Sequence, residues 1–377
     1  MITYAHLKES NLYQPEEIQT ETRLGRFTSL LARSKGQLCL VLVMGLFIMI
    51  LVFIIPQSTK QPKLKPCSDN LQLPQHSGCN REEALCARAY NNVAYATMHN
   101  AFATSQDGFV FPQHRACMRS GLVSGIRAFM LDAYLITASD ELKLCHESCG
   151  LGSSSLTKAL RMFEEFLRLN PREIVTIIWE FKVDGQAHRT PQDIASLKRL
   201  LVLAMKSTGL IPYLHSQTSR VDQEWPTLND MIANNSRLVS LTDTNAFDEE
   251  SWDMYTYDYA FETRFDSKSK AELDRSCVPN RGLLQNSLFI LNHFTVLAAI
   301  GVDTTVTDNL AEFTGIDNLL GINQEPYMWN RISDCAQCLG RFPNFVAVDF
   351  WESSDVIQVV KKMNSVTFQT SNSTCIY

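Results

Sequence analysis

The stretch SLTKALRMFEEFLRLNPREIVTIIWE, residues 155–180, joins a helical pattern directly to a strand pattern. Leu156, Leu160, Phe163 and Leu167 recur at spacings of four, three and four, so they line one face of a helix. The apolar run at 174–179 then predicts a buried strand. Amphipathic helices that alternate with apolar strands are typical of a parallel sheet covered by helices.

Further apolar runs repeat this arrangement along the chain; they lie at 93–98, 128–131, 238–241, 288–291 and 345–348. Thr190 and Pro191, followed by Asp193, predict the start of another helix, and Gly209 predicts its end. We therefore expect one α/β domain over residues 79–364, in which the sheet closes into a barrel. An open doubly wound sheet is the alternative, but no glycine-rich phosphate loop follows the first run.

Polar residues follow each of the six runs at its carboxyl end; they include His99, Asp132, Glu180, Asp243, Asn292 and Asp349. In a closed α/β barrel these ends meet at one rim, where barrel enzymes carry their catalytic residues. An isolated histidine is more often structural than catalytic. Here, however, His99 and His146 both lie at or just beyond strand ends. Two histidines on either side of a phosphate suit acid–base cleavage of a phosphodiester.

Asp132 shares a strand face with Met130 and has no obvious lysine or arginine partner in the sequence. A buried carboxylate without a cation is costly. Asn100, Asp132 and Glu180 offer hard oxygen ligands, which predicts a calcium site. Alternatively, Asp132 accepts hydrogen bonds from Arg127 or from a backbone amide.

The uncharged segment LCLVLVMGLFIMILVFII, residues 38–55, is long enough to cross a membrane. We predict a cytoplasmic tail at 1–36, a transmembrane signal anchor at 37–56, a stalk at 57–78 and a C-terminal tail at 365–377. A cleaved signal peptide is the alternative, but a long polar stretch precedes the segment and no small-residue cleavage site follows it.

Of the 11 cysteines, all but Cys39 follow the predicted span. An even set on one side of a membrane predicts disulfides in an oxidising compartment. Glycosylation sequons begin at Asn234 and Asn372 on the same side. These patterns predict a single-pass type II membrane protein with a luminal or extracellular catalytic domain.

The composition argues against two classes, disordered proteins and nucleic-acid-binding proteins. The chain has 377 residues, of which 45% are hydrophobic and 20% are charged, with a net charge of −6. Disorder of the whole chain is excluded by this balance. Because no domain is basic, we expect no nucleic-acid partner.

Five motifs occur in a fixed order: ATMHNAF, GIRAFMLDAYL, LCHESC, FLRLNPREIVTIIWEF and PNFVAVDFW. In this order they resemble the phosphatidylinositol-specific phospholipase C X-domain superfamily, in particular its plant and fungal X-domain-only branch, over roughly residues 85–364. The resemblance implies a distorted TIM (β/α)8 barrel that cleaves a phosphoinositide by transphosphorylation. It further implies His99 as general base, His146 as general acid and Asp349 as the carboxylate that orients the first histidine.

The resemblance also indicates which residues would bind a calcium ion. Calcium-dependent members have ligands that match Asn100, Asp132 and Glu180, with a glutamate where this chain has Met130. Metal-independent bacterial members have an arginine where this chain has Asp132. We therefore expect a calcium-assisted site with one ligand missing.

The predicted function is cleavage of an inositol phospholipid or a glycosylphosphatidylinositol (GPI)-type lipid, with Arg127, Asp243 and Asn292 as substrate-binding residues. A glycerophosphodiesterase-like enzyme is one alternative, although Met130 breaks the Glu-x-Asp metal pair that such barrels use. A catalytically degenerate, membrane-tethered lipid- or glycan-binding barrel is the other. Met130 favours that reading, and the retention of both histidines opposes it.

Overall fold

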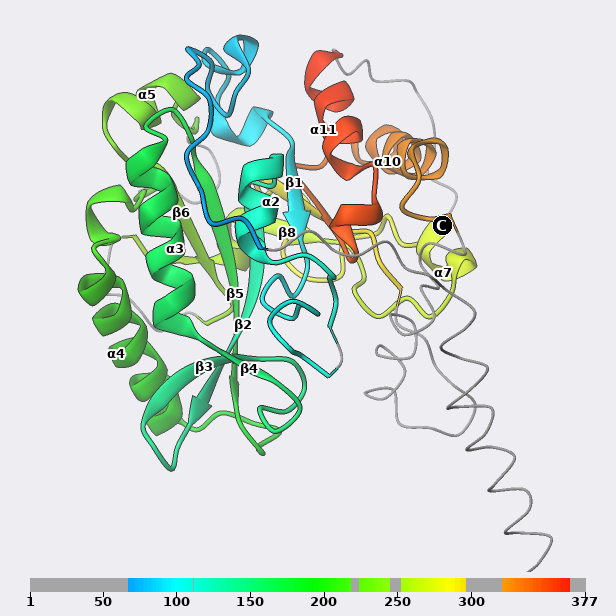
Figure 1. Cartoon of the computed structure of the whole chain (residues 1–377). Helices are drawn as coiled ribbons and strands as arrows, with labels where there is room; N and C mark the ends of the chain where they lie inside the picture. The colour runs from blue at the N-terminus through cyan, green and yellow to red at the C-terminus, as the bar shows by residue number, and fades with distance from the viewer. Residues whose placement is uncertain (1–66, 111, 218–223, 245–251, 296–320, 367–377) are drawn as a thin grey trace, which may run out of the picture. The chain divides into compact units, whose positions relative to one another are not determined.

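The six apolar runs form strands of one sheet (Figure 1). These strands are β1 (Tyr95–Met98), β2 (Ala128–Ile136), β5 (Val175–Val183), β6 (Leu238–Thr242), β9 (Leu288–Asn292) and β10 (Phe345–Val348). Every residue of β1, β6, β9 and β10 is buried. Strands covered on both faces read as continuous apolar runs, which is why the sequence revealed them.

The computed structural model describes residues 67–366 apart from 111, 218–223, 245–251 and 296–320. The predicted transmembrane segment, the amino-terminal tail and Asn372 lie outside these residues. Among the helices described, none is long and apolar enough to cross a membrane. Residues 64–377 group into one structural unit.

Within the described residues the sheet has ten strands, and its main path runs β7-β6-β5-β2-β1-β10-β9-β8. Neighbours along this path are all parallel. Strands of this path that follow each other in the chain are neighbours except β7 and β8, and the last strand, β10, returns to pair with β1. The two ends of the path are β7 (Met254–Tyr255) and β8 (Ala260–Glu262), short strands that the sequence did not reveal. The fold is α/β with a curled, parallel, barrel-like sheet.

β2 and β5 extend beyond their apolar runs. Asp132 and Glu180 therefore lie inside strands, whereas the sequence analysis placed each directly after a strand. Beyond the carboxyl end of β1, the antiparallel strand β3 (Glu141–Cys145) takes the place beside β2, and β4 (Ser153–Ser155) pairs with β3. This added pairing supports the extension of β2.

Helices α3 (Leu156–Leu169) and α4 (Pro191–Thr208) form where the sequence predicts them and lie side by side against the sheet (Figure 1). Thr190 and Asp193 form a capping box at the start of α4, and Gly209 ends it with a φ of 78°. The other helices are α2 (Met118–Ser124), α5 (Leu228–Ala233), α6 (Thr256–Tyr259), α7 (Lys270–Asp274), α10 (Glu325–Leu339) and α11 (Val356–Ser365). Short 3₁₀ turns lie at Glu83–Leu85, Tyr90–Asn92, Ile211–Tyr213 and Trp351–Ser353.

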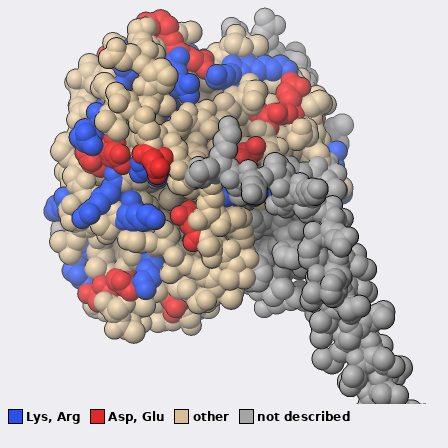
Figure 2. All heavy atoms as spheres, viewed as in Figure 1, with Lys and Arg blue, Asp and Glu red and all other residues tan. Residues whose placement is uncertain are grey.

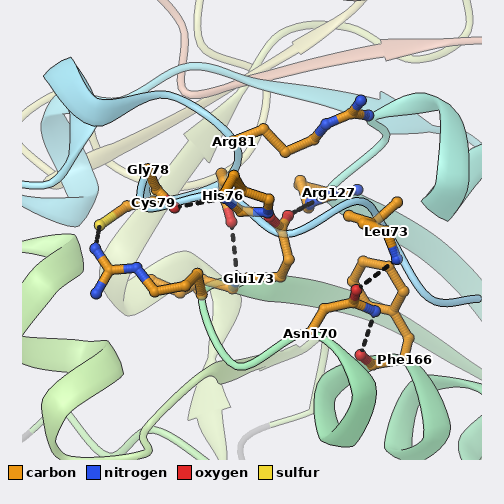
Figure 3. Close-up of polar contacts among 12 residues, drawn as sticks. Leu73, His76, Gly78, Cys79, Arg81, Arg127, Phe166, Asn170 and Glu173 are labelled. Carbon is orange, nitrogen blue, oxygen red and sulfur yellow. Dashed lines mark hydrogen bonds and ion pairs between the residues drawn. The ribbon is translucent and has the colours of Figure 1, made fainter.

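The described part of the predicted stalk is attached to the domain. Leu71 is fully buried. The side chain of Asn170, at the end of α3, accepts a hydrogen bond from Leu73 N at 2.8 Å (Figure 3). It also donates one to Leu71 O at 2.9 Å. The Cys67–Cys117 disulfide ties the same segment to the start of α2.

Disulfides are present as the cysteine pattern predicts. Four pairs join described residues: Cys67–Cys117, Cys79–Cys86, Cys145–Cys149 and Cys277–Cys335. Acidic and basic side chains are intermixed over the face seen in Figure 2. The potential on that face is therefore local and of mixed sign.

Candidate active site

A cavity of about 70 Å³ opens at the carboxyl end of the parallel strands. Five of the predicted site residues line it together with Met130: His99, Asp132, Glu180, Asp243 and Asn292. Met130 and Asp132 both face this space, as strand alternation predicts. The six side chains come from β1, β2, β5, β6 and β9 or from the residue that follows the strand. The curled sheet thus brings together residues far apart in the sequence.

A wider groove of about 870 Å³ adjoins the cavity. The two spaces share Glu180, Asp243 and Arg281. Lys182 and Arg189 line the groove only. The narrow cavity and the broad groove together form one candidate site.

Three contacts hold His99 in place beside the cavity. Its Nδ1 lies 2.9 Å from Asp349 Oδ1. Its ring stacks on Phe294, with ring centres 3.8 Å apart and planes 6° from parallel. The buried His114 donates from Nε2 to His99 O at 2.6 Å. With Nδ1–H donating to Asp349, Nε2 carries the lone pair that a general base needs.

Burial dominates the electrostatics of this pair. It lowers the pKa of His99 to about 4, against the opposite effect of Asp132 and Glu180. Burial also raises the pKa of Asp349 well above its ordinary value. His99 is therefore the neutral imidazole at neutral pH, which is the protonation state of a base.

Asp132 and Glu180 stand directly opposite each other on the parallel strands β2 and β5. Like charges in this position repel. The sequence analysis found no cation for Asp132, and that was wrong: Lys182 Nζ lies 2.9 Å from Asp132 Oδ2 and 3.6 Å from Glu180 Oε1. Burial lowers the pKa of Lys182, but the two carboxylates outweigh burial and raise it above its ordinary value. The lysine is therefore charged, and Arg127 has no part in this contact.

The predicted calcium ligands do not fit a resident ion as the structure arranges them. Asn100 is buried, with a φ of 44°, and is not among the described residues that line the cavity. Asp132 already binds an ammonium group. Within the described ranges, no three His, Cys, Asp or Glu side chains cluster as a metal site.

His146 directly follows β3 and is buried. The Cys145–Cys149 disulfide encloses it in a tight loop, in which Glu147 has a φ of 60°. β3 runs antiparallel to β2, with Leu144 opposite Ala133, so His146 lies near the same rim. It is not among the described residues that line the 70 Å³ cavity. Its role as general acid stays a prediction.

Arg127 occupies a different place from the one predicted. It precedes β2 at the amino end of the strands, is buried, and donates from Nε to Glu173 Oε2 at 2.5 Å (Figure 3). Its Nη1 donates to Leu122 O and Ile126 O, each at 2.7 Å. These contacts stabilise the base of the sheet and leave Arg127 far from the rim along β2. They do not support the predicted contact with substrate.

Asp243 and Asn292 line the cavity and are themselves held in place. Asp243 accepts hydrogen bonds from Phe181 N at 3.2 Å and from Arg189 at 3.1 Å. Asn292 donates to Thr263 O at 2.9 Å. Their contact with a substrate stays a prediction. Asn234, the described sequon asparagine, is exposed at the end of α5.

Several site residues escaped the sequence analysis, among them Lys182, Glu262 and Arg281. Arg281 Nε is ion-paired with Glu262, the last residue of β8. The guanidinium also lies over the ring of Phe265 at 4.5 Å. For Lys182 a signal existed, because it lies two residues beyond Glu180 and so shares its strand face. For Glu262 and Arg281 the strand was too short to recognise.

Comparison with known proteins agrees with this arrangement. The family described as PI-PLC X 1 matches residues 85–364. A PI-PLC X domain-containing protein of Arabidopsis thaliana is 27% identical over 300 residues, which are 73% of this chain and 62% of that protein. PI-PLC X domain-containing protein 1 of Arthroderma benhamiae is 24% identical over 302 residues, covering 76% of this chain and 90% of that protein.

Among solved structures, a phosphatidylinositol-specific phospholipase C of Staphylococcus aureus is similar, with a TM-score of 0.49 and 11% identity. The similarity covers 74% of this chain and 95% of that one. The family match spans most of the chain and contains every residue that lines the cavity. The chain therefore belongs to the PI-PLC X family.

Proposed function

We propose that this protein is a phosphodiesterase that cleaves an inositol phospholipid or a GPI-type lipid. The observation that carries the proposal is the contact of His99 with Asp349 at 2.9 Å, in which His99 lines the cavity. A carboxylate that holds one ring nitrogen of a histidine fixes the tautomer and leaves the other nitrogen as a base. Family membership supports the same class of reaction.

The proposed step uses a hydroxyl of the substrate as nucleophile. His99 Nε2 takes the proton of the inositol 2-hydroxyl, whose oxygen bonds to phosphorus. The bond from phosphorus to the diacylglycerol oxygen breaks, and His146 donates a proton to that oxygen. The products are an inositol 1,2-cyclic phosphate and diacylglycerol. Because nucleophile and phosphate belong to one molecule, little entropy is lost in bringing them together.

The groove favours a headgroup whose charge is limited to the diester. Its cations Lys182, Arg189 and Arg281 are ion-paired with Asp132, Asp243 and Glu262 respectively. Glu147 and Glu180 add further carboxylates. Among the described residues the groove therefore has no surplus of positive charge for extra phosphate groups. Hydroxyl-rich headgroups, such as unphosphorylated inositol or a glycan, suit it better.

A membrane-anchored form, type II with the domain luminal or extracellular, is part of the proposal. Support comes from the four disulfides, which are typical of oxidising compartments. The uncharged segment 38–55 supports a signal anchor. In such a compartment, GPI-type lipids and lipids from outside the cell are the accessible substrates.

The test is release of water-soluble inositol phosphate from labelled phosphatidylinositol by the full-length chain in mixed micelles. We expect cyclic inositol phosphate from the wild type and none above background from His99→Ala. Arg199→Ala, at an exposed ion pair with Asp140, serves as the control with unchanged turnover. A wild type that releases no more than His99→Ala would contradict the proposal. A phosphatidylinositol bisphosphate substrate in parallel tests the headgroup preference.

Met130 in the cavity wall favours one other candidate, a lipid- or glycan-binding barrel without turnover. Vesicle sedimentation with phosphatidylinositol separates the two. If the protein only binds lipid, His99→Ala should still sediment with the vesicles. The wild-type protein should then cleave no phosphatidylinositol.

A further inference from the structure

The carboxylate pair of the site, Asp132 and Glu180, is built to hold a positive charge. The two residues face each other in register on β2 and β5. Asp132 is 4% exposed, and both side chains line the cavity. The Glu180 side chain is 45% exposed, so Asp132 is the buried member of the pair. A buried carboxylate beside a second carboxylate is stable only with a cation nearby.

The chain supplies that cation itself. Lys182 follows Glu180 by two residues on β5, so its side chain leaves the same face of the sheet. In the ladder Lys182 is opposite Tyr134, which places it diagonally across from Asp132. Its Nζ is 2.9 Å from Asp132 Oδ2 and 3.6 Å from Glu180 Oε1. The ammonium group thus lies at the carboxylates that the family resemblance assigns to calcium.

The position of Lys182 also suits contact with substrate. Its side chain is 33% exposed and lines the groove, whereas Asp132 lines only the cavity. An ammonium group has three donors. Asp132 accepts one of them, and Glu180 lies beyond hydrogen-bond length. Donors therefore remain for a phosphate oxygen at the junction of cavity and groove.

We propose that the Lys182 ammonium replaces a metal ion in this site and stabilises the negative charge that develops on the phosphate oxygens during cleavage. This inference rests on the proposed phosphodiesterase function. Lys182 contacts a non-bridging oxygen, Asp132 and Glu180 hold the ammonium in place, and His99 and His146 transfer the protons. A fixed cation of this kind needs no reorganisation when charge develops.

The first experiment compares turnover of full-length wild type with a calcium chelator and with added calcium. We expect the two rates to agree within twofold. Lys182→Met should lower kcat by about 10²- to 10³-fold with a much smaller change in KM, the effect of losing one charge-stabilising donor. Lys182→Arg, which keeps the charge, should retain at least a tenth of wild-type turnover.

The matched control is Lys143→Met. Lys143 also pairs with a carboxylate at 2.9 Å, Glu141, but on β3 away from the cavity. The turnover of Lys143→Met should equal that of wild type. If Lys182→Met does not fold because Asp132 is left unpaired, Asp132→Asn/Lys182→Met removes both charges and takes its place. Loss of wild-type activity on chelation with recovery on adding calcium overturns the proposal, as does a methionine variant within threefold of wild type.

A second readout does not depend on activity. Calcium is titrated calorimetrically into wild type and into Asp132→Asn/Glu180→Gln. We expect the same heats from both, since Lys182 already holds the carboxylates. A wild-type site that the double variant lacks overturns the proposal. If no inositol phosphate is released under any condition, the proposed function fails, and this titration still decides which cation the carboxylates hold.

Discussion

Asp349 Oδ1 lies 2.9 Å from His99 Nδ1, although 250 residues separate them in the chain. The contact follows from strand pairing. β1 and β10 are parallel neighbours, and Met98 is opposite Val348, so the next residue of each strand meets its counterpart at the rim. β1 and β10, the first and last strands along the chain, thus position the histidine and the carboxylate that holds it.

Replacing Asp349 by asparagine should lower kcat by on the order of 10³- to 10⁴-fold, because the amide no longer fixes the tautomer of His99. KM should change little, since Asp349 is not among the described residues of the cavity wall. Steady-state kinetics on phosphatidylinositol check this. Asp140→Asn, at an exposed carboxylate, is the control. A variant with normal kcat would show that Asp349 does not orient the base.

The acidic limb of the pH profile should lie below the ordinary histidine value. Burial lowers the pKa of His99 to about 4, while its side chain keeps 21% exposure, so the limb should fall between about 4 and 6.5. Activity is present above this limb and disappears as His99 gains a proton below it. Measurement of kcat/KM from pH 3.5 to 8 checks the position. A midpoint above 6.5 would contradict the assignment.

Removing either of two disulfides, one beside His146 and one in the core, should affect activity and stability to different degrees. Cys145 and Cys149 are 4 residues apart, and Cys277 and Cys335 are 58 apart. From loop entropy, replacing the first pair by alanines should cost about 2 kcal/mol and the second about 4 kcal/mol. Because the first pair holds the His146 loop, its removal should lower kcat more. Denaturant unfolding and kinetics on both variants test this. Equal kcat values would assign the small loop a purely structural part.

Arg127→Met should destabilise the domain by about 3–5 kcal/mol, since it leaves the buried carboxylate of Glu173 without its guanidinium. Among the described residues, the Glu173 carboxylate then keeps one ion-pair partner, His76, whose Nε2 is 2.9 Å from Oε1 (Figure 3). The kcat of the folded fraction should not change, because Arg127 lies at the amino end of the strands. Thermal and denaturant unfolding give the first quantity. Arg199→Met is the exposed control, with a cost within about 0.5 kcal/mol.

Asn234→Gln should remove one glycan from protein made in secretory cells, if the domain faces the lumen as proposed. Asn234 is exposed at the end of α5, so its side chain is accessible to modification. Ser236→Ala, which destroys the same sequon, should give the same shift on a gel. Glycosidase treatment should abolish the difference from wild type. Unmodified wild type would argue against a luminal domain or against use of this site.

Four of the six strands that the sequence revealed are buried along their whole length. β1, β6, β9 and β10 read as plain apolar runs because helices and sheet cover them fully. β4 has the sequence SSS, and β7 has two residues, so neither carries a pattern that periodicity detects. Their pairing depends on neighbours distant in the chain.

The hidden ends of β2 and β5 explain why the sequence analysis found no cation for Asp132. Asp132 and Glu180 looked like the first polar residues after a strand, because strands that end at a rim often stop there. In fact β5 continues to Val183 and carries Lys182 on the same face. Extended in this way, the strand supplies a cation beside Asp132 that the sequence analysis did not find.

The sequence by itself determined the α/β class, the helix caps, the disulfide-bearing region and the set of polar residues at the strand ends. Local propensity, periodicity and composition act over a few residues, so they can be read without a structure. Only the tertiary structure decided which of those residues meet. Arg127 binds Glu173 below the site, and Lys182 binds Asp132 within it. Partner choice is set by strand register and by the cost of burying an unpaired charge, and both depend on chain segments far apart in sequence.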